Sequence, residues 1–193
     1  LLVPLILLDL PLATVTAAYT GYLFAQAEGR DLWQSPLLPA QLVVRAVMAG
    51  AAFALTAQLA LGVAADGGGP TLAQVGVGVW ALVALGVALP VHLGLLVAAE
   101  AMVPTASEAA RVAFSAIHHG RYRHLHWTGG IWLGHLLPLG LALSYPWIAE
   151  RLGLLGVGAL HTWPLVAITT AVLAGLYALE HAFVMAPQEV PNS

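Results

Sequence analysis

The sequence predicts an all-α fold, a polytopic bundle of about five transmembrane helices that forms one domain over residues 1–193. Hydrophobic residues make up 60% of the chain and charged residues only 8%, whereas about 25% of residues are charged in ordinary soluble domains. The mean hydropathy is +0.88. So few charges cannot cover a soluble surface, and the solvent must therefore be a bilayer. The long apolar segments also lack the period-2 alternation of a transmembrane β-barrel.

A helix that crosses a bilayer needs about 20 mainly apolar residues. Five segments meet this condition: residues 3–26, 38–65, 71–102, 125–148 and 159–185. The turn 66–70, Asp-Gly-Gly-Gly-Pro, is short enough to make the second and third segments antiparallel neighbours. The polar stretch 104–124 separates the third segment from the fourth, and it predicts a short interfacial helix capped by Thr105 or Ser107.

Five crossings put the loop 27–37, the loop 103–124 and the C-terminal tail on one side of the membrane. Five of the six basic residues lie on or near that side: Arg30, Arg45, Arg111, Arg121 and Arg123. The positive-inside rule then predicts a multi-pass protein of the inner (cytoplasmic) cell membrane with a cytoplasmic C-terminus. A net charge of −3 gives no support for a nucleic-acid partner.

The chain contains no cysteine, which excludes an iron–sulfur cluster or a thiolate-bound metal on this chain. Electrons that pass through it therefore need a bound organic cofactor or a histidine-ligated haem. Leu1 has no preceding Met and lies within a membrane segment. We therefore expect that the natural chain extends further upstream.

Ionisable groups within a membrane are costly, so each is a candidate functional residue. Asp9 is expected either to relay protons or to be a protonated carboxyl that is hydrogen-bonded to another helix. Arg45 is expected to extend its side chain to the arginine-rich interface. His92, His135 and His181 lie within helices, where they could clamp a haem, serve a proton path or join two helices.

Four further histidines gather in the arginine-rich loop and at the start of the fourth segment: His118, His119, His124 and His126. We find no carboxylate or thiolate that joins them, and their spacing matches no zinc signature. They are therefore expected to be solvated interface residues, and no metal is expected on the chain. Trp33 is expected to be an interfacial aromatic residue.

Tyr19 and Tyr22 lie three residues apart, on one face of the first predicted helix. The residues alone favour hydrogen bonds from these hydroxyls to another helix over a role in ligand binding. Gly21, beside Tyr19, leaves room for a neighbouring helix or for a flat ring.

Two separated motifs resemble the NrfD/PsrC family, the membrane anchors of polysulfide-reductase-type molybdoenzyme complexes. The more specific motif runs over residues 19–39, Tyr-Thr-Gly-Tyr-Leu-Phe-Ala-Gln-Ala-Glu-Gly-Arg-Asp-Leu-Trp-Gln-Ser-Pro-Leu-Leu-Pro. The ending 183–193 looks like the Ala-x-Gln-x-x-Pro-x-Ser ending of the family, and the Gly-Arg-Tyr-Arg sequence at 120–123 is similar in character. The resemblance spans essentially the whole chain.

The resemblance implies a haem-free subunit of eight or more crossings. Such a subunit exchanges electrons between the membrane quinone pool (menaquinone or ubiquinone) and a 4Fe-4S ferredoxin-like subunit, which is wired to a molybdopterin catalytic subunit. Tyr19 matches the family tyrosine that contacts the quinone, and its histidine and asparagine partners come from the first helix of the family pattern. This chain resembles roughly the last five crossings, so other membrane helices or subunits must complete that site.

The leading hypothesis is therefore a quinone-interacting anchor in which Tyr19 and Gly21 bind quinone and Asp9, His92 and His135 transfer protons. The chemistry on the terminal substrate would belong to a partner subunit, so no catalytic residue is expected on this chain. One alternative is a b-type cytochrome anchor with haem held by the membrane histidines. The other is a structural or proton-conducting NrfD-like subunit of a respiratory complex.

Overall fold

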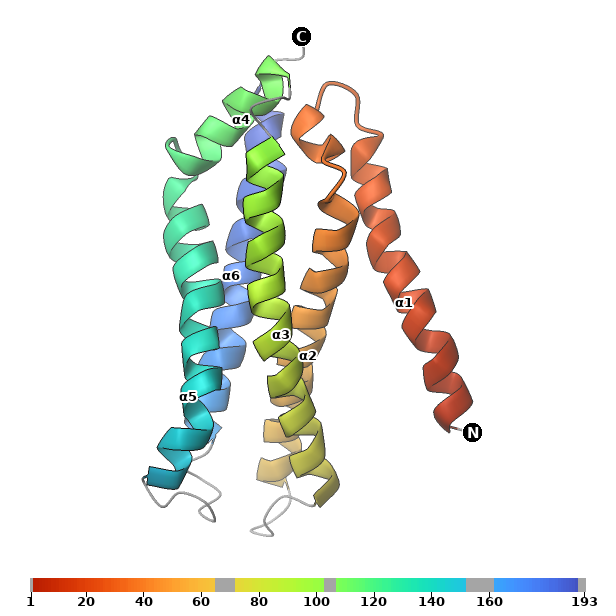
Figure 1. Cartoon of the computed structure of the whole chain (residues 1–193), viewed down its shortest axis with the longest axis vertical. Helices are drawn as coiled ribbons and strands as arrows, with labels where there is room; N and C mark the ends of the chain where they lie inside the picture. The colour runs from red at the N-terminus through yellow and green to blue at the C-terminus, as the bar shows by residue number, and fades with distance from the viewer. Residues whose placement is uncertain (1, 65–71, 103–106, 152–161, 191–193) are drawn as a thin grey trace.

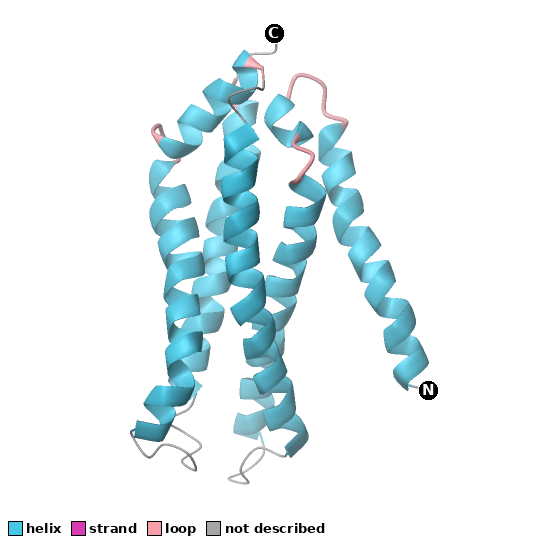
Figure 2. Cartoon of the chain, viewed as in Figure 1, coloured by secondary structure: helices cyan, strands magenta, loops and turns pink. Residues whose placement is uncertain are grey.

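A computed structural model describes residues 2–64, 72–102, 107–151 and 162–190 of the chain. In this part of the chain the regular structure is helical throughout, without strands (Figures 1 and 2). The helices are α1 (Leu2–Ala25), the short 3-10 helix η1 (Asp31–Gln34), α2 (Leu38–Ala64), α3 (Leu72–Met102), α4 (Glu108–His118), the π-helix η3 (Leu125–Leu136), α5 (Leu137–Arg151) and α6 (Thr162–Gln188).

The predicted crossings correspond to these helices. Within the described residues, α1, α2, α3 and α6 are each long and apolar enough to cross a membrane. The predicted fourth crossing corresponds in sequence to η3 and α5, of 12 and 15 residues, and α5 begins at the residue that follows η3. Neither of these two helices is among the four described helices that are long and apolar enough to cross a membrane. The structure thus confirms the predicted all-α membrane bundle. The predicted turn 66–70 lies outside the described residues.

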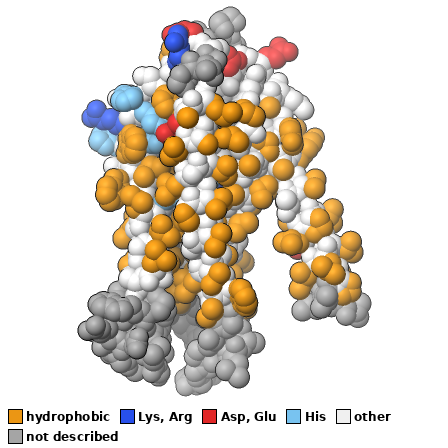
Figure 3. All heavy atoms as spheres, in the orientation of Figure 1, with side chains coloured by type: hydrophobic (Ala, Val, Ile, Leu, Met, Phe, Trp, Pro, Cys, Tyr) orange, Lys and Arg blue, Asp and Glu red, His pale blue; other side chains and the backbone are white. Residues whose placement is uncertain are grey.

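The core of the bundle lies between α2, α3, α5 and α6. Its fully buried side chains are apolar: Met48, Leu55, Leu85, Leu89, Ile168 and Val172. Helix α1 leans away from the other helices in Figure 1, and only 6% of its apolar window is buried, against 56% in α6. Hydrophobic side chains cover the sides of the bundle in Figure 3. The surface of α1 is therefore suited to contact lipid or further membrane helices.

Helix α4 begins where the sequence predicted a cap. The Ser107 hydroxyl accepts a hydrogen bond from the Ala110 backbone N–H at 3.3 Å, so Ser107 is the N-cap. The alternative cap, Thr105, lies outside the described residues. The Ser107 hydroxyl also bonds to the Asp31 carboxylate in η1, which joins α4 to the loop that precedes α2.

The loop 27–37, α4 and the end of α6 meet at one end of the molecule (Figure 1). Arg30 Nη1 donates to the backbone carbonyls of Pro187 and Val190, at 2.8 Å each. Arg121 pairs with Glu189 at 2.7 Å, and the Tyr122 hydroxyl donates to the same carboxylate at 2.6 Å. Burial raises the pKa of Tyr122, so its hydroxyl stays a donor at neutral pH. These contacts confirm that the three segments share one end.

Candidate functional site

Glycines bring η3 into close contact with α6. A Cβ atom added to Gly134 would lie 2.5 Å from Cα of Gly175, and one added to Gly130 would lie 2.3 Å from Cδ2 of Leu179. A side chain at Gly134 would separate the two helices, because it would meet backbone, and one at Gly130 would displace the Leu179 side chain. The π-helical geometry of η3 is itself rare and is frequently found at functional sites. Both histidines of η3, His126 and His135, are buried.

Arg45 of α2 is the centre of a polar cluster inside the bundle. Its side chain is only 6% exposed, and Nη1 lies 2.8 Å from Oε1 of Glu180 in α6. Its Nε lies 2.9 Å from Nε2 of His92 in α3. The prediction that Arg45 extends to the interface is therefore wrong. Arg45 projects between α3 and α6, where it finds a carboxylate and an imidazole acceptor.

His92 and His135 continue the cluster from α3 into η3. Nδ1 of His92 lies 2.7 Å from Nε2 of His135, and Nδ1 of His135 lies 2.8 Å from the Gly130 carbonyl oxygen. Both rings are 0% exposed. They stack with an interplanar angle of 16° and a centroid separation of 5.0 Å.

The Arg45 guanidinium at one end and the Gly130 carbonyl at the other determine which nitrogen of each histidine carries the ring proton. A guanidinium only donates, so Nε2 of His92 accepts from Arg45 and the ring proton of a neutral His92 sits on Nδ1. His92 then donates to Nε2 of His135, and His135 donates from Nδ1 to the Gly130 carbonyl. The result is a directional chain of hydrogen bonds from Arg45 to η3.

This geometry does not fit a haem held between His92 and His135. Two axial imidazoles would have their nitrogens about 4 Å apart, taking roughly 2 Å for each metal–nitrogen bond. The nitrogens of His92 and His135 are 2.7 Å apart and are bonded to each other. The third membrane histidine, His181, lies with its ring near Tyr177 and Tyr122.

The residues expected to bind quinone lie on α1. Tyr19 and Tyr22 are 57% and 59% exposed, and within the described part of the chain neither hydroxyl has a hydrogen-bond partner. A Cβ atom added to Gly21 would lie 2.9 Å from Cα of Pro39, so Gly21 permits a close contact between α1 and α2. Asp9 is exposed on α1 and is not brought to the Arg45 cluster.

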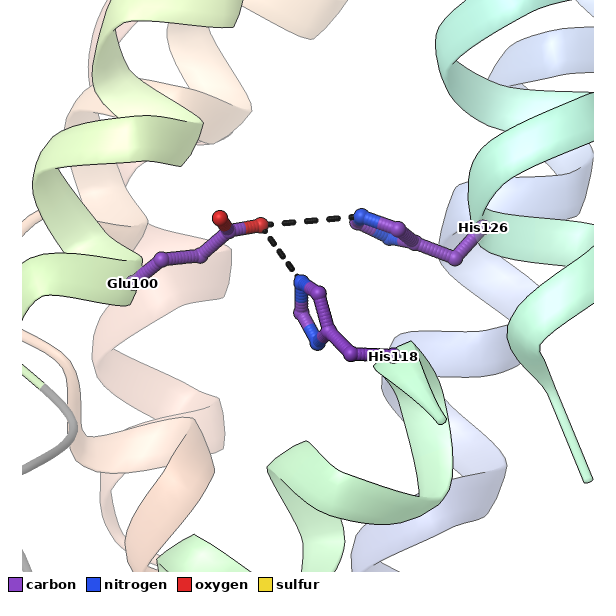
Figure 4. Close-up of side chains that lie close together, drawn as sticks. All are labelled: Glu100, His118 and His126. Carbon is purple, nitrogen blue, oxygen red and sulfur yellow. Dashed lines mark hydrogen bonds and ion pairs between the residues drawn. The ribbon is translucent and has the colours of Figure 1, made fainter. Parts of the chain in front are cut away.

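The four histidines near α4 divide into two pairs. His119 and His124 are exposed, as expected. The same expectation is wrong for His118 and His126, which are 8% and 4% exposed. Nε2 of His118 lies 2.8 Å from Oε1 of Glu100, and Nε2 of His126 lies 3.6 Å from that oxygen (Figure 4). A carboxylate does join these histidines, and it comes from the end of α3.

The segments that carry the two sequence motifs contact each other. Trp33, in the first motif, is half-buried and donates from Nε1 to the Phe183 carbonyl at 3.0 Å. Phe24 packs edge-on against the rings of both Trp33 and Phe183. Together with the bonds from Arg30 to the end of α6, these contacts join the two motifs into one surface. This surface lies at the end of the molecule that carries Arg30, Arg111, Arg121 and Arg123, which we call the arginine-rich end.

The chain was compared with known protein families, curated proteins and solved structures. The family described as polysulphide reductase, NrfD, matches residues 2–179, which is most of the chain. No curated protein and no solved structure matches the chain.

Proposed function

Because the chain belongs to the NrfD family, and is thus a membrane subunit of the polysulfide-reductase type, we propose that it is a quinone-reactive anchor. The single observation that carries this proposal is the polar cluster of Glu180, Arg45, His92 and His135. The first three of these residues lie on α6, α2 and α3, which are long enough to cross a membrane, and His135 lies on η3. Ionisable groups in such a position are costly and are typical of proton or ion pathways. The proposed partners are a 4Fe-4S ferredoxin-like subunit and a molybdopterin catalytic subunit.

A quinone takes up two electrons and two protons to become a quinol, so its anchor must supply a proton route as well as contacts. We assign the contact to Tyr19, whose hydroxyl is free, within the described residues, to donate to a quinone carbonyl. Gly21 supports this role because it lets α1 pack closely on Pro39 of α2. This contact sets the position of Tyr19 relative to α2. Residues on other helices would contact the opposite side of the ring.

We assign proton transfer to His92 and His135, with Asp9 on α1 as a further group. The Arg45 guanidinium donates to Nε2 of His92, so a proton reaches that atom only when the guanidinium releases it. Glu180 can hold the guanidinium meanwhile, because it already bonds to a different nitrogen, Nη1. Arg45 thereby orients both imidazoles and controls access to them.

The arginine-rich end is proposed to face the cytoplasm of the cell, in the inner membrane, with the C-terminus on the same side. A cysteine introduced at Arg121 should then react with a membrane-impermeant maleimide only when the cytoplasmic face is exposed. Labelling of that cysteine in intact cells, with the outer face accessible, would reverse the orientation.

Tyr19→Phe tests the quinone assignment, because it removes one hydroxyl and little volume. A net hydrogen bond of about 0.5–1.5 kcal/mol predicts a loss of quinone affinity of about 2- to 10-fold. The measurement is the apparent KM for quinone in turnover of the purified complex. Tyr177→Phe is the matched control, because Tyr177 is similarly exposed, at 69%, but lies on α6.

Electron transfer from the catalytic subunit to a soluble dye bypasses the membrane and should be unchanged in both variants. Wild-type quinone kinetics in Tyr19→Phe would remove the tyrosine from the site. If Tyr19→Phe kept wild-type quinone kinetics but an Arg45 variant lowered proton uptake during turnover of the complex, a second candidate function would be favoured. That function is a proton-conducting subunit without its own quinone site.

A further inference from the structure

Three side chains from three helices converge at the arginine-rich end of the bundle. Glu100 comes from α3, His118 from α4 and His126 from η3, and Figure 4 shows them pointing toward one another. One ligand atom from each residue lies within 4.8 Å of the others. The side chains of His118 and His126 are 7% and 5% exposed, and that of Glu100 is 29% exposed.

The hydrogen bonds around His118 direct a lone pair toward the centre of this cluster. Nδ1 of His118 lies 3.1 Å from the Phe114 carbonyl oxygen, which only accepts, so Nδ1 carries the ring proton. A neutral His118 therefore presents a bare Nε2 to the Glu100 carboxylate, 2.8 Å away. Two acceptors at that distance repel each other unless a cation or a proton lies between them.

His126 adds a second nitrogen that has no other use in the described structure. Its Nε2 is buried and has no hydrogen-bond partner, and it lies 3.6 Å from the same Glu100 oxygen. A buried polar atom without a partner destabilises the folded state unless a ligand supplies the missing bond. One nitrogen of each imidazole and one carboxylate oxygen thus face one point.

We propose that Glu100, His118 and His126 bind a divalent transition-metal ion, for which Zn²⁺ is the best match. Two histidines and one glutamate are a known set of three protein ligands for zinc, with water in the fourth position. Bonds of about 2.0–2.2 Å in a tetrahedron place the ligand atoms roughly 3.3 Å apart. The observed separations of 2.8 and 3.6 Å from the Glu100 oxygen lie on either side of that value.

The surroundings of the cluster suit such an ion. A cavity of about 80 Å³ is bordered by all three residues and also by Gln41 and Arg45, so water can occupy the fourth position. The bond from Nδ1 of His118 to the Phe114 carbonyl is the kind of outer contact that orients metal-bound histidines. A bound ion would join the interfacial helix α4 to α3 and η3. It would also add positive charge beside the Arg45 cluster.

The test is metal titration of the purified complex after treatment with a chelator. Co²⁺ reports the geometry through its visible absorption bands, and Zn²⁺ affinity follows from competition with a chromophoric chelator. We expect one tight site on the wild-type chain with the intense bands of tetrahedral cobalt. Glu100→Gln and His126→Gln each keep a polar side chain of similar size, and each should weaken Zn²⁺ binding by more than about 100-fold.

The matched control replaces the exposed pair, His119→Ala with His124→Ala, and should retain the site. A second readout guards against misfolding, because Zn²⁺ should raise the thermal midpoint of the wild type and the control but not of the two ligand variants. Equal Zn²⁺ affinity in wild type and ligand variants would overturn the proposal. So would a wild type that binds no Zn²⁺, since the cluster would then be an ion pair held by a proton.

Discussion

Replacing Arg45 by Met is expected to lower quinone-linked turnover by about 100-fold or more, the usual contribution of a positioned proton-transfer group. The change removes the donor that holds His92 in one tautomer, so the hydrogen bond between His92 and His135 loses its fixed direction. It also leaves Glu180 without its cation. Breaking a buried ion pair lowers the free energy of unfolding by about 3–5 kcal/mol. Because the Glu180 side chain is 38% exposed, we expect this variant to lose about 3 kcal/mol of stability or less.

The measurements are turnover with quinone, turnover with a soluble dye, and unfolding in detergent. Arg111→Met is the control for loss of an arginine, because Arg111 is exposed and its ion pair within the described residues is with Glu108 of its own helix. The double variant Arg45→Met with Glu180→Gln removes both charges, so it should regain stability without regaining quinone turnover. Recovery of turnover in the double variant would show that the cluster is structural.

Gly175→Ala is expected to lower the free energy of unfolding of the bundle by about 1–3 kcal/mol, the usual cost of overpacking. A Cβ atom at Gly175 would lie 2.0 Å from Cα of Gly134, and backbone cannot move aside as a flexible side chain can. Helices η3 and α6 must therefore separate. His135 follows Gly134 directly, so the 2.7 Å contact with His92 should lengthen and quinone turnover should fall as well.

Gly94→Ala provides the matched control, because a Cβ atom at Gly94 meets nothing within 4 Å. Gly94 lies two residues from His92 on α3, and alanine is favoured over glycine inside a helix by about 1 kcal/mol. This variant should be neutral or slightly more stable in thermal unfolding. A Gly175→Ala variant as stable as wild type would mean that η3 and α6 do not pack through these glycines.

The fold could be predicted from the sequence because the bilayer imposes a minimum length on each crossing. The predicted segments 38–65 and 71–102 differ by one residue or less at each end from α2 and α3. Ser107, one of two predicted caps, is the observed cap of α4. Successive crossings alternate in direction, which predicts that the loop 27–37, the loop 103–124 and the C-terminal tail lie at one end. The hydrogen bonds of Arg30 and the ion pair of Arg121 confirm this prediction.

The candidate site was harder to predict because its partners are distant in sequence. Arg45 and Glu180 are 135 residues apart, and depth along a helix does not reveal which face a residue occupies. The described part of the loop around His118 and His126 contains no carboxylate that pairs with both, because their partner, Glu100, comes from the preceding helix. The sequence did contain one indication of the site. Glu100 and Glu180 lie near the same predicted membrane side as the arginine and the histidines that they contact.

The most direct test of the central claim is photolabelling of the intact complex with a photoreactive quinone, followed by peptide mapping. We expect label on the α1 peptide that contains Tyr19, and we expect an excess of unlabelled quinone to suppress it. Tyr19→Phe should reduce the label, and the Tyr177→Phe control should not. Label that is confined to other subunits, or that unlabelled quinone does not suppress, would contradict the assignment of this chain as the quinone-reactive anchor.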